Sequence, residues 1–304
     1  MLMKKIFCVA DHLFAVNIQE NVSLWPYLAN YLPFEIEPTN DCLSSLIFAL
    51  DVREQTDTCL SDDIHCVVEY DNDVVAIGIY SDAAGTQLVR IAANKYRLDE
   101  AGWLVWKQGS REITLLLKSD SSTEHKVFVI NNSLMLLYAM FTAGLNTLLM
   151  HASVVIYSER AFVFLGKSGT GKSTHSRLWL EHIAGTSLLN DDNPVIRILD
   201  NHEIRVYGSP WSGKTPCYKN ESAKLGAVVR LSQAPVNEIE RLEGVAAYIA
   251  VLPSASGMKW DRKLTEGMHN TLAALAHDGA VFQLKCRPDR EAAVLCNRIV
   301  TESL

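Results

Sequence analysis

The sequence has no pair of cysteines spaced as C-x-x-C, and no cysteine spacing that is typical of a metal site. Its seven cysteines lie at positions 8, 42, 59, 66, 217, 286 and 296. An odd number of cysteines cannot all pair within one chain. The pattern therefore favours reduced thiols that are mostly buried.

A long apolar run is missing as well. The most apolar long segment, Leu134–Leu149, is interrupted by Thr142, Gly144, Asn146 and Thr147. It falls short of the ~20 apolar residues that a membrane span needs, and it predicts a buried helix. The first ten residues briefly imitate a signal peptide, but Asp11 and His12 interrupt them. We therefore expect a cytoplasmic protein with no membrane partner.

An excess of positive charge is also absent. The formal net charge is −7 and the pI is about 5.7, so we expect no nucleic acid partner, although a local basic pocket is compatible with this balance. With 304 residues, of which 48% are hydrophobic and 21% charged, the chain can bury one large core or two ordinary ones.

One glycine-rich stretch organises the rest of the chain. It fits the phosphate-binding loop, in which two glycines bracket four residues and Lys-Ser follows. Its residues are Gly166, Lys167, Ser168, Gly169, Thr170, Gly171, Lys172 and Ser173, followed by Thr174. An apolar run, Ala161–Leu165, precedes the loop, and a helical pattern opens near Thr174. This strand, loop and helix context predicts a nucleotide site rather than a chance turn.

The residue types in this loop suit a nucleoside triphosphate. Glycines allow positive φ and a close approach of backbone N–H groups to phosphate oxygens, and the following helix adds its positive N-terminal end. Lys172 would place a charge on the β and γ phosphates. The Ser173 hydroxyl would complete the coordination of a magnesium ion. We therefore expect ATP and Mg²⁺ as the ligands.

Residues 1–130 read as a separate, smaller, β-rich α+β domain without a catalytic constellation. The strands predicted there are 64–70, 74–80, 88–92, 103–106, 113–117 and 126–130, and a short helix is predicted over 43–50. A role of this domain in recognition or oligomerisation stays open, so a homo-oligomer is one of the expected partners.

Residues 131–304 read as the nucleotide-binding domain. A helix is predicted to start at a cap in Asn131–Ser133, because apolar residues then recur at helical spacing. Two apolar runs, 152–157 and 161–165, predict an antiparallel hairpin that leads into the phosphate loop. Strands are predicted over 187–190, 204–207, 225–231 and 280–285, and helices around 268–275 and after Asp289. Residues 239–252 fit either one helix or a strand followed by a helix.

Two neighbouring carboxylates follow the strand over 187–190. Asp191 and Asp192 come 19 and 20 residues after Lys172, where a returning strand would bring them to the phosphate side of the sheet. One would bind magnesium, and the other would act as general base. A solvated Asp-Asp-Asn-Pro turn is the alternative. We assign the metal to Ser173 and Asp192, and catalytic roles to Asp191, Asp192, Lys172 and His151.

Several cations remain open from the residues alone. The segment 208–214 has the composition of a mobile cover that ends in a cation, Lys214, and an ordinary surface turn is equally compatible. The charge that stabilises the transferring group could come from any of four residues, Arg230, Arg241, Lys259 and Arg262.

Three segments in this order resemble a known family. Met150-His151-Ala152, the loop from Gly166 to Ser173, and Asp191-Asp192 are similar to segments of HPr serine kinase/phosphorylase, in the phosphoenolpyruvate carboxykinase-like superfamily. The resemblance spans roughly residues 148–200. It implies an α/β fold with a mixed, largely antiparallel sheet around a P-loop and helices outside. It also implies that His151 lies near the phosphates and that the Asp pair supplies base and metal ligand.

The chain departs from that family at Thr174, where HPr kinases carry an acidic residue. The sequence looks closer to HPr-kinase-like proteins that accompany peptide-modification systems. We expect a kinase that moves the γ-phosphate of ATP to a hydroxyl, with serine of a peptide or protein foremost and other protein or small-molecule acceptors open. The alternatives are a nucleotide-binding regulatory protein without efficient transfer and a simple nucleoside triphosphatase.

Overall fold

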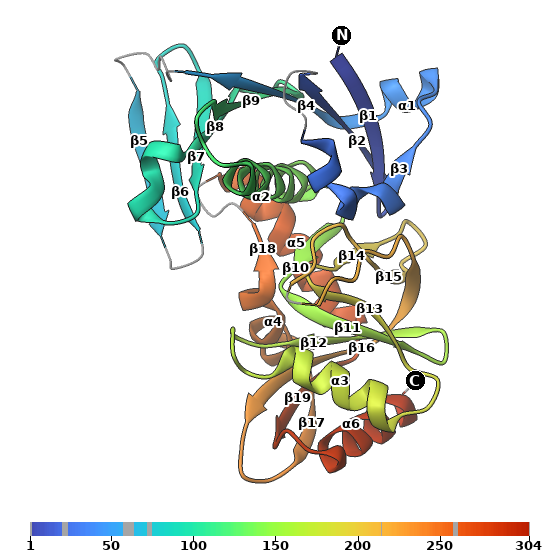
Figure 1. Cartoon of the computed structure of the whole chain (residues 1–304). Coiled ribbons are helices and arrows are strands. Elements are labelled where there is room, and N and C mark those ends of the chain that lie inside the picture. The colour runs from blue at the N-terminus through green and yellow to red at the C-terminus, as the bar shows by residue number, and fades with distance from the viewer. Residues whose placement is uncertain are drawn as a thin grey trace. The chain divides into compact units, whose positions relative to one another are not determined.

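The computed structural model describes residues 2–19, 24–56, 64–71, 75–213, 215–257 and 261–303. They form two compact units, Met1–Phe141 and Thr142–Leu304. Each unit is a mixed sheet with helices (Figure 1). The boundary lies later than the one drawn after residue 130 from the sequence, because a helix that packs within the first unit runs to its end.

The first unit is built on a nine-stranded sheet with the order β3-β1-β2-β4-β9-β8-β7-β6-β5. Only the pairs β2–β4 and β4–β9 are parallel within this path. Its elements are β1 (Leu2–Val9), β2 (His12–Gln19), β3 (Glu35–Ile36), α1 (Asn40–Ser44), β4 (Leu46–Gln55), β5 (His65–Asp71), β6 (Ala76–Ser81), β7 (Thr86–Ala92), β8 (Gly102–Lys107), β9 (Glu112–Lys118) and α2 (Thr123–Thr142). The strands predicted over 64–70, 74–80, 88–92, 103–106 and 113–117 are confirmed as β5 to β9. Residues 72–74, which include most of the turn expected over 71–73, lie outside the described residues.

The helix predicted over 43–50 is wrong. Helix α1 ends at Ser44, and β4 begins at Leu46. Phe48, Leu50 and Val52 are fully buried at alternate positions, which is the period of a strand. β4 pairs on both sides with parallel neighbours, so it is a central strand of the sheet.

Helix α2 corrects two further predictions. Residues 126–130, expected as a strand, lie inside it, and Asn131–Ser133 do not cap it. Its N-terminal cap is Ser122, whose hydroxyl accepts a hydrogen bond from the His125 N–H at 3.2 Å. The amides of Asn131 and Asn132 instead donate to carbonyls of the preceding turn. The buried segment 134–149 is therefore not one helix, since α2 ends at Thr142 and a strand follows.

The second unit holds the phosphate loop in a ten-stranded sheet. Eight strands follow the order β13-β11-β12-β16-β15-β14-β10-β18, and β19 pairs with both β16 and β17. The strands are β10 (Thr147–Met150), β11 (Ala152–Tyr157), β12 (Arg160–Leu165), β13 (Ser187–Asp192), β14 (Val195–Ile198), β15 (Ile204–Tyr207), β16 (Ser222–Gln233), β17 (Glu238–Leu242), β18 (Ala255–Ser256) and β19 (Val281–Cys286). The predicted hairpin is confirmed as β11 and β12, and residues 239–252 form a strand followed by a helix.

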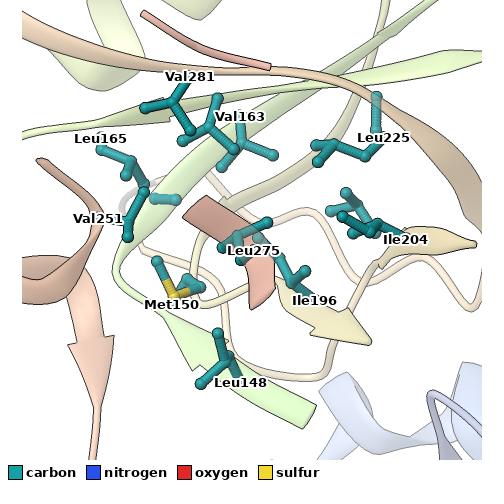
Figure 2. Packing of buried hydrophobic residues seen from close by; sticks show 14 of the residues in the cluster. Leu148, Met150, Val163, Leu165, Ile196, Ile204, Leu225, Val251, Leu275 and Val281 are labelled. Carbon is teal, nitrogen blue, oxygen red and sulfur yellow. The ribbon is translucent and has the colours of Figure 1, made fainter. Parts of the chain in front are cut away.

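Helices cover both faces of this sheet. On one face, α3 (Lys172–His182) and α6 (Arg290–Glu302) pack through a cluster centred on Trp179, which is fully buried. On the other face, α4 (Gly244–Val251) and α5 (Arg262–Asp278) bury a second cluster. Figure 2 shows Val163 and Leu165 of β12 in this second cluster with Val251 and Leu275. Among the described helices of the chain, none is long and apolar enough to span a membrane.

Strand direction gathers the candidate residues at one edge of the sheet. Strands β12, β16 and β19 are parallel to one another, so they end at the same edge. Strand β11 is antiparallel to both β12 and β13, so β13 also ends there and β11 begins there. The phosphate loop, the end of β13 with Asp191 and Asp192, and His151 before β11 therefore meet at one edge.

Candidate functional site

The loop from Gly166 to Ser173 joins β12 to α3 and depends on its glycines. Gly166, Gly169 and Gly171 have φ values of 154°, 81° and 102°. These conformations suit glycine, because other residues reach positive φ only with strain. A Cβ on Gly166 would lie 2.4 Å from the Thr170 hydroxyl oxygen. The backbone thus turns closely enough to present N–H groups at the start of α3, where the helix dipole is positive.

Lys172 is the first residue of α3, and its ammonium group is held inside the loop. Its Nζ donates to the Gly166 carbonyl at 2.9 Å and lies 2.9 Å from His151 Nε2. Burial lowers the pKa of Lys172, although the charges of Asp192 and Asp191 act in the opposite direction. The ammonium group is therefore only partly compensated by protein groups, and an anion at the loop would complete its environment.

The contacts of His151 define its tautomer. A lysine ammonium group only donates hydrogen bonds, so His151 Nε2 accepts from Lys172. The proton then resides on His151 Nδ1, which lies 3.0 Å from Asp192 Oδ1. The other oxygen, Asp192 Oδ2, accepts from the Asn193 amide at 2.7 Å. Asp192 therefore orients the imidazole, and both of its carboxylate oxygens are engaged.

Asp191 has a different environment. Its side chain is only 5% exposed, and its Oδ1 has no hydrogen-bond partner among the described residues. Asp191 faces Ser153 in the register of β13 and β11, and the Ser153 hydroxyl is hydrogen-bonded to Ser176 of α3. Asp191 therefore lies on the α3 side of the sheet, the side on which Ser173 begins that helix. A buried carboxylate oxygen without a donor is a ready ligand for a cation.

The described part of the segment, residues 208–213, braces the two carboxylates and does not have the contacts of a mobile cover. The Ser209 hydroxyl is fully buried; it donates to the Asn193 carbonyl at 2.6 Å and accepts from the Trp211 N–H. The Gly213 N–H donates to the Asp191 carbonyl, and a Cβ on Gly213 would lie 3.2 Å from the Asp192 Cβ. The cation expected at the end of this segment, Lys214, lies outside the described residues.

His175 packs between β12 and α3, the two elements that the phosphate loop joins. It lies on α3, it is 3% exposed, and its Nε2 accepts from the Trp179 indole at 3.1 Å. Its ring meets Phe164 of β12 edge to face, with centroids 4.7 Å apart. Burial lowers the pKa of His175 to about 4 from 6.5. The imidazole is therefore neutral in the folded protein at neutral pH.

This buried histidine predicts a loss of stability in acid. In the unfolded chain His175 becomes protonated as the pH falls below 6.5, whereas in the folded protein it becomes protonated only near pH 4. Its contribution is therefore complete above pH 6.5 and is lost between pH 6.5 and 4, with about 2 kcal/mol lost by pH 5. We expect the free energy of unfolding, measured in urea, to fall more between pH 7.5 and pH 5 for the wild type than for His175→Gln. Equal declines would contradict the assignment.

Two hollows border the phosphate loop, one on each side of the sheet. The α3-side hollow, about 400 Å³, is lined by Gly171, Thr174 and Leu178, and by Leu231, Cys286 and Pro288 at the ends of β16 and β19. The α4-side hollow, about 690 Å³, is lined by His151, Lys167, Arg230, Ser254, Gln283 and Lys285, among others. The α3-side hollow also has Gln233 and Arg287 in its lining, so it combines apolar and polar groups, whereas the α4-side hollow gathers Lys167, Arg230 and Lys285.

The structure distinguishes among the four cations that the sequence left open. Arg230 lines the α4-side hollow beside Gly166 and His151. Arg241 borders other hollows, away from the loop, and Arg262 is exposed and paired with Glu266. Lys259 lies outside the described residues. Only Arg230 of this set lies at the loop in the described part of the chain.

Sequence reasoning missed Lys285 and the polar brace of Asn190, Asn193 and Ser209. Lys285 is one of many surface lysines in the sequence, and only the register of β19 with β16 brings it to the loop. The brace had a signal, since Asn190 and Asn193 flank the two aspartates. The side-chain oxygen Oδ1 of Asn190 accepts from the backbone N–H groups of Asp192 and Asn193, both at 3.0 Å, and this fixes the turn.

Comparison with known proteins gives weak structural likenesses. No protein-family model matches the chain, and no curated protein matches its sequence. Among solved structures, the HPr(Ser) kinase/phosphatase from Coxiella burnetii matches with 11% sequence identity and a TM-score of 0.30. The match covers 51% of this chain and 95% of that chain.

Proposed function

We propose that this chain is an ATP- and Mg²⁺-dependent phosphotransferase of the HPr-kinase-like kind, which moves the γ-phosphate to a hydroxyl, foremost a serine of a peptide or protein. One observation carries the proposal: Lys172 of the phosphate loop contacts His151, which is paired with Asp192 at the same sheet edge. A loop that only bound nucleotide would not need an oriented imidazole beside its lysine.

The two hollows support an orientation for the nucleotide. The α3-side hollow borders Gly171 and Thr174 and has the apolar side chains of Leu178 and Leu231, which suit a nucleobase. His151, next to Lys172, borders the other hollow. The base would occupy the α3-side hollow, and the γ-phosphate would lie near Lys172 and His151.

Cys286 provides a test of that orientation, because its thiol lines the α3-side hollow. Burial raises the pKa of the Cys286 thiol, so labelling with iodoacetamide should be followed at about pH 8.5. We expect Mg-ATP to slow alkylation of Cys286 at least about tenfold, because a base in the hollow would cover it. Cys66, exposed in the first unit, is the internal control. Unchanged labelling of Cys286 with saturating Mg-ATP would contradict the orientation.

The residues at the γ-phosphate supply the acid–base chemistry. When Lys172 turns to the phosphates, His151 Nε2 is left with a free lone pair, and Asp192 keeps the imidazole in place. The acceptor oxygen forms a bond to the γ-phosphorus as the bond from that phosphorus to the β-phosphate oxygen breaks. The hydroxyl proton passes to His151 Nε2, and ADP carries away the leaving-group electrons. Arg230 is a cation beside this position, suited to the charge of the transferring group.

Magnesium fits the residues present. Ser173 is exposed at the start of α3, and Asp191 has an unpartnered buried oxygen. In the described part of the chain no group of three His, Cys, Asp or Glu residues could hold a metal unaided, so phosphate oxygens would complete the set. A bound magnesium ion would neutralise charge on the β and γ phosphates. Because the oxygens of Asp192 are engaged, Asp191 replaces Asp192 as the proposed metal ligand.

Replacing Asp191 by asparagine should separate this role from stability. We expect Asp191→Asn to raise the free energy of unfolding by about 1 kcal/mol or more without ligands, because a buried carboxylate whose Oδ1 has no donor among the described residues is neutralised. The same variant should lose most of the magnesium dependence of nucleotide affinity, measured as the ratio of ATP dissociation constants with EDTA and with Mg²⁺. Asp200→Asn, at an exposed position, is the matched control. An unchanged ratio in Asp191→Asn would assign the metal elsewhere.

The alternative is a nucleotide-binding regulatory protein, favoured by Thr174 where HPr kinases carry an acidic residue. The two functions differ in the fate of the γ-phosphate. Label from [γ-³²P]ATP should move to serine-containing peptides in the wild type and not in His151→Gln, with free phosphate measured in the same samples. Tight ATP binding without transfer or release would favour the regulatory protein. Release of free phosphate without any transfer of label to the peptides would favour a nucleoside triphosphatase.

A further inference from the structure

The α4-side hollow is positively charged in a protein whose net charge is −7. Lys167, Arg230 and Lys285 line it, and no aspartate or glutamate is among the described residues of its lining. None of these three side chains forms an ion pair with a carboxylate in the part of the chain that the structure describes. Glu238 stands opposite Lys285 in the register of β17 and β19, but it is not part of the lining. The hollow is therefore suited to an anion.

The alternation of the strands explains why these cations share one side. Val229, Leu231 and Leu284 belong to the core beneath α3 and α6. Successive side chains of a strand point to opposite faces, so Arg230 and Lys285 point to the α4 side. There the hollow also meets Ala250 of α4. The alternation of the strands thus sets the side on which both cations lie, where Arg230 is partly buried and Lys285 is exposed.

Arg230 lies next to the phosphate loop, whereas Lys285 lies further from it than the phosphates of a bound nucleotide would. Arg230 is paired in register with Leu165, the last residue before the loop, whereas Lys285 is paired with Ser232, further along β16 and one strand further away. Lys285 therefore lies two strand spacings, about 10 Å, from β12. The phosphate chain already has Lys172 and the loop N–H groups. Lys285, at about 10 Å from β12, is therefore placed to face an acceptor that approaches the γ-phosphate from the α4 side.

The acceptor hydroxyl must reach His151, which lines the same hollow. We propose that the acceptor is a serine next to a carboxylate, either an acidic side chain or the carboxyl terminus of a peptide, and that Lys285 binds that carboxylate while Arg230 faces the transferring group. The proposal rests on the proposed function and deepens it by naming the acceptor class. A volume of about 690 Å³ suits a short extended segment.

Binding of matched peptides tests this proposal without requiring turnover. The full chain, loaded with magnesium and the non-hydrolysable AMP-PNP, is titrated calorimetrically with three acetylated peptides: Gly-Ala-Ser-Asp-Gly amide, Gly-Ala-Ser-Asn-Gly amide, and Gly-Gly-Ala-Ser with a free carboxylate. We expect at least one carboxylate peptide to bind about tenfold more tightly than the Asn peptide. Which of the two does so distinguishes an acidic side chain from a carboxyl terminus.

The variant Lys285→Met should abolish the preference and leave the AMP-PNP dissociation constant within about twofold of the wild type. Lys224→Met, on the same sheet but at the opposite end of β16, should keep both properties. Circular dichroism checks that each variant is folded. If Lys285→Met is not folded, Lys285→Gln takes its place.

Equal binding of the three peptides, or no binding of any, would overturn the proposal. So would a large loss of AMP-PNP affinity in Lys285→Met, which would assign the cation to the nucleotide. The titrations are repeated without nucleotide. A failure of AMP-PNP to bind would overturn the proposed function, and the preference for anionic peptides would still be measured on its own.

Discussion

Replacing Lys172 by methionine is expected to weaken Mg-ATP binding by about 100-fold, because charge-assisted hydrogen bonds to phosphate are each worth roughly 1.5–3 kcal/mol. The fold should tolerate the change. Burial lowers the pKa of Lys172, so its charge is partly desolvated in the free protein, and a methionine of similar length removes that cost. Fluorescence titration with a labelled ATP analogue and thermal unfolding measure the two effects on one sample.

Lys263→Met is the matched control, since Lys263 is exposed in the first turn of another helix, α5. It should leave both affinity and melting temperature unchanged. If Lys172→Met bound Mg-ATP as tightly as the wild type, the glycine-rich loop would be only a turn between β12 and α3. Loss of folding in this variant would show that the Gly166 and His151 contacts of Lys172 are structural.

His151→Gln and Asp192→Asn should each lower phosphate transfer by about 100-fold to 10,000-fold while nucleotide still binds. The reason is that the imidazole takes the hydroxyl proton and Asp192 fixes its tautomer, with Nδ1 and Oδ1 3.0 Å apart. The double variant should be no slower than the slower single variant, because the two residues act as one unit. The measurements are label transfer to serine peptides and phosphate release to water.

Asp200→Asn again controls for the loss of a carboxylate. Additive losses in the double variant would mean that His151 and Asp192 act independently. Full activity in His151→Gln together with loss in Asp191→Asn would move the role of base to Asp191. That residue was one of the two candidates for the base in the sequence, so the experiment decides between neighbours on one strand.

The sequence predicts the centre of the second unit well, and the reason is local. The hairpin of β11 and β12, the glycines of the loop and the start of α3 are each specified by residues next to one another in the chain. Asp191 and Asp192 come at the end of β13, so a short connection brings them back to the loop. Features of this kind can be predicted from the spacing of residues along the chain.

The rest depends on tertiary pairing that spacing does not express. Residues 127–130 are apolar, and Val127, Val129 and Ile130 are β-branched, so the segment resembles a strand. Packing on the first sheet nevertheless makes it part of α2, where Tyr138 donates to the Val9 carbonyl. Lys285 reaches the loop only because β19 adds to β16 in parallel. Likewise, which Asp has a free oxygen depends on the brace formed by Ser209 and Asn193.

The measurement that tests the central claim most directly is calorimetric titration of Mg-ATP, ATP with EDTA, and AMP into the wild-type chain. The account predicts one molecule of Mg-ATP per chain, an affinity at least about tenfold lower without magnesium, and little binding of AMP, because the loop, Lys172 and Asp191 act on the β and γ phosphates and their metal. Equal affinity for Mg-ATP and AMP, or no heat with any of the three, would contradict it.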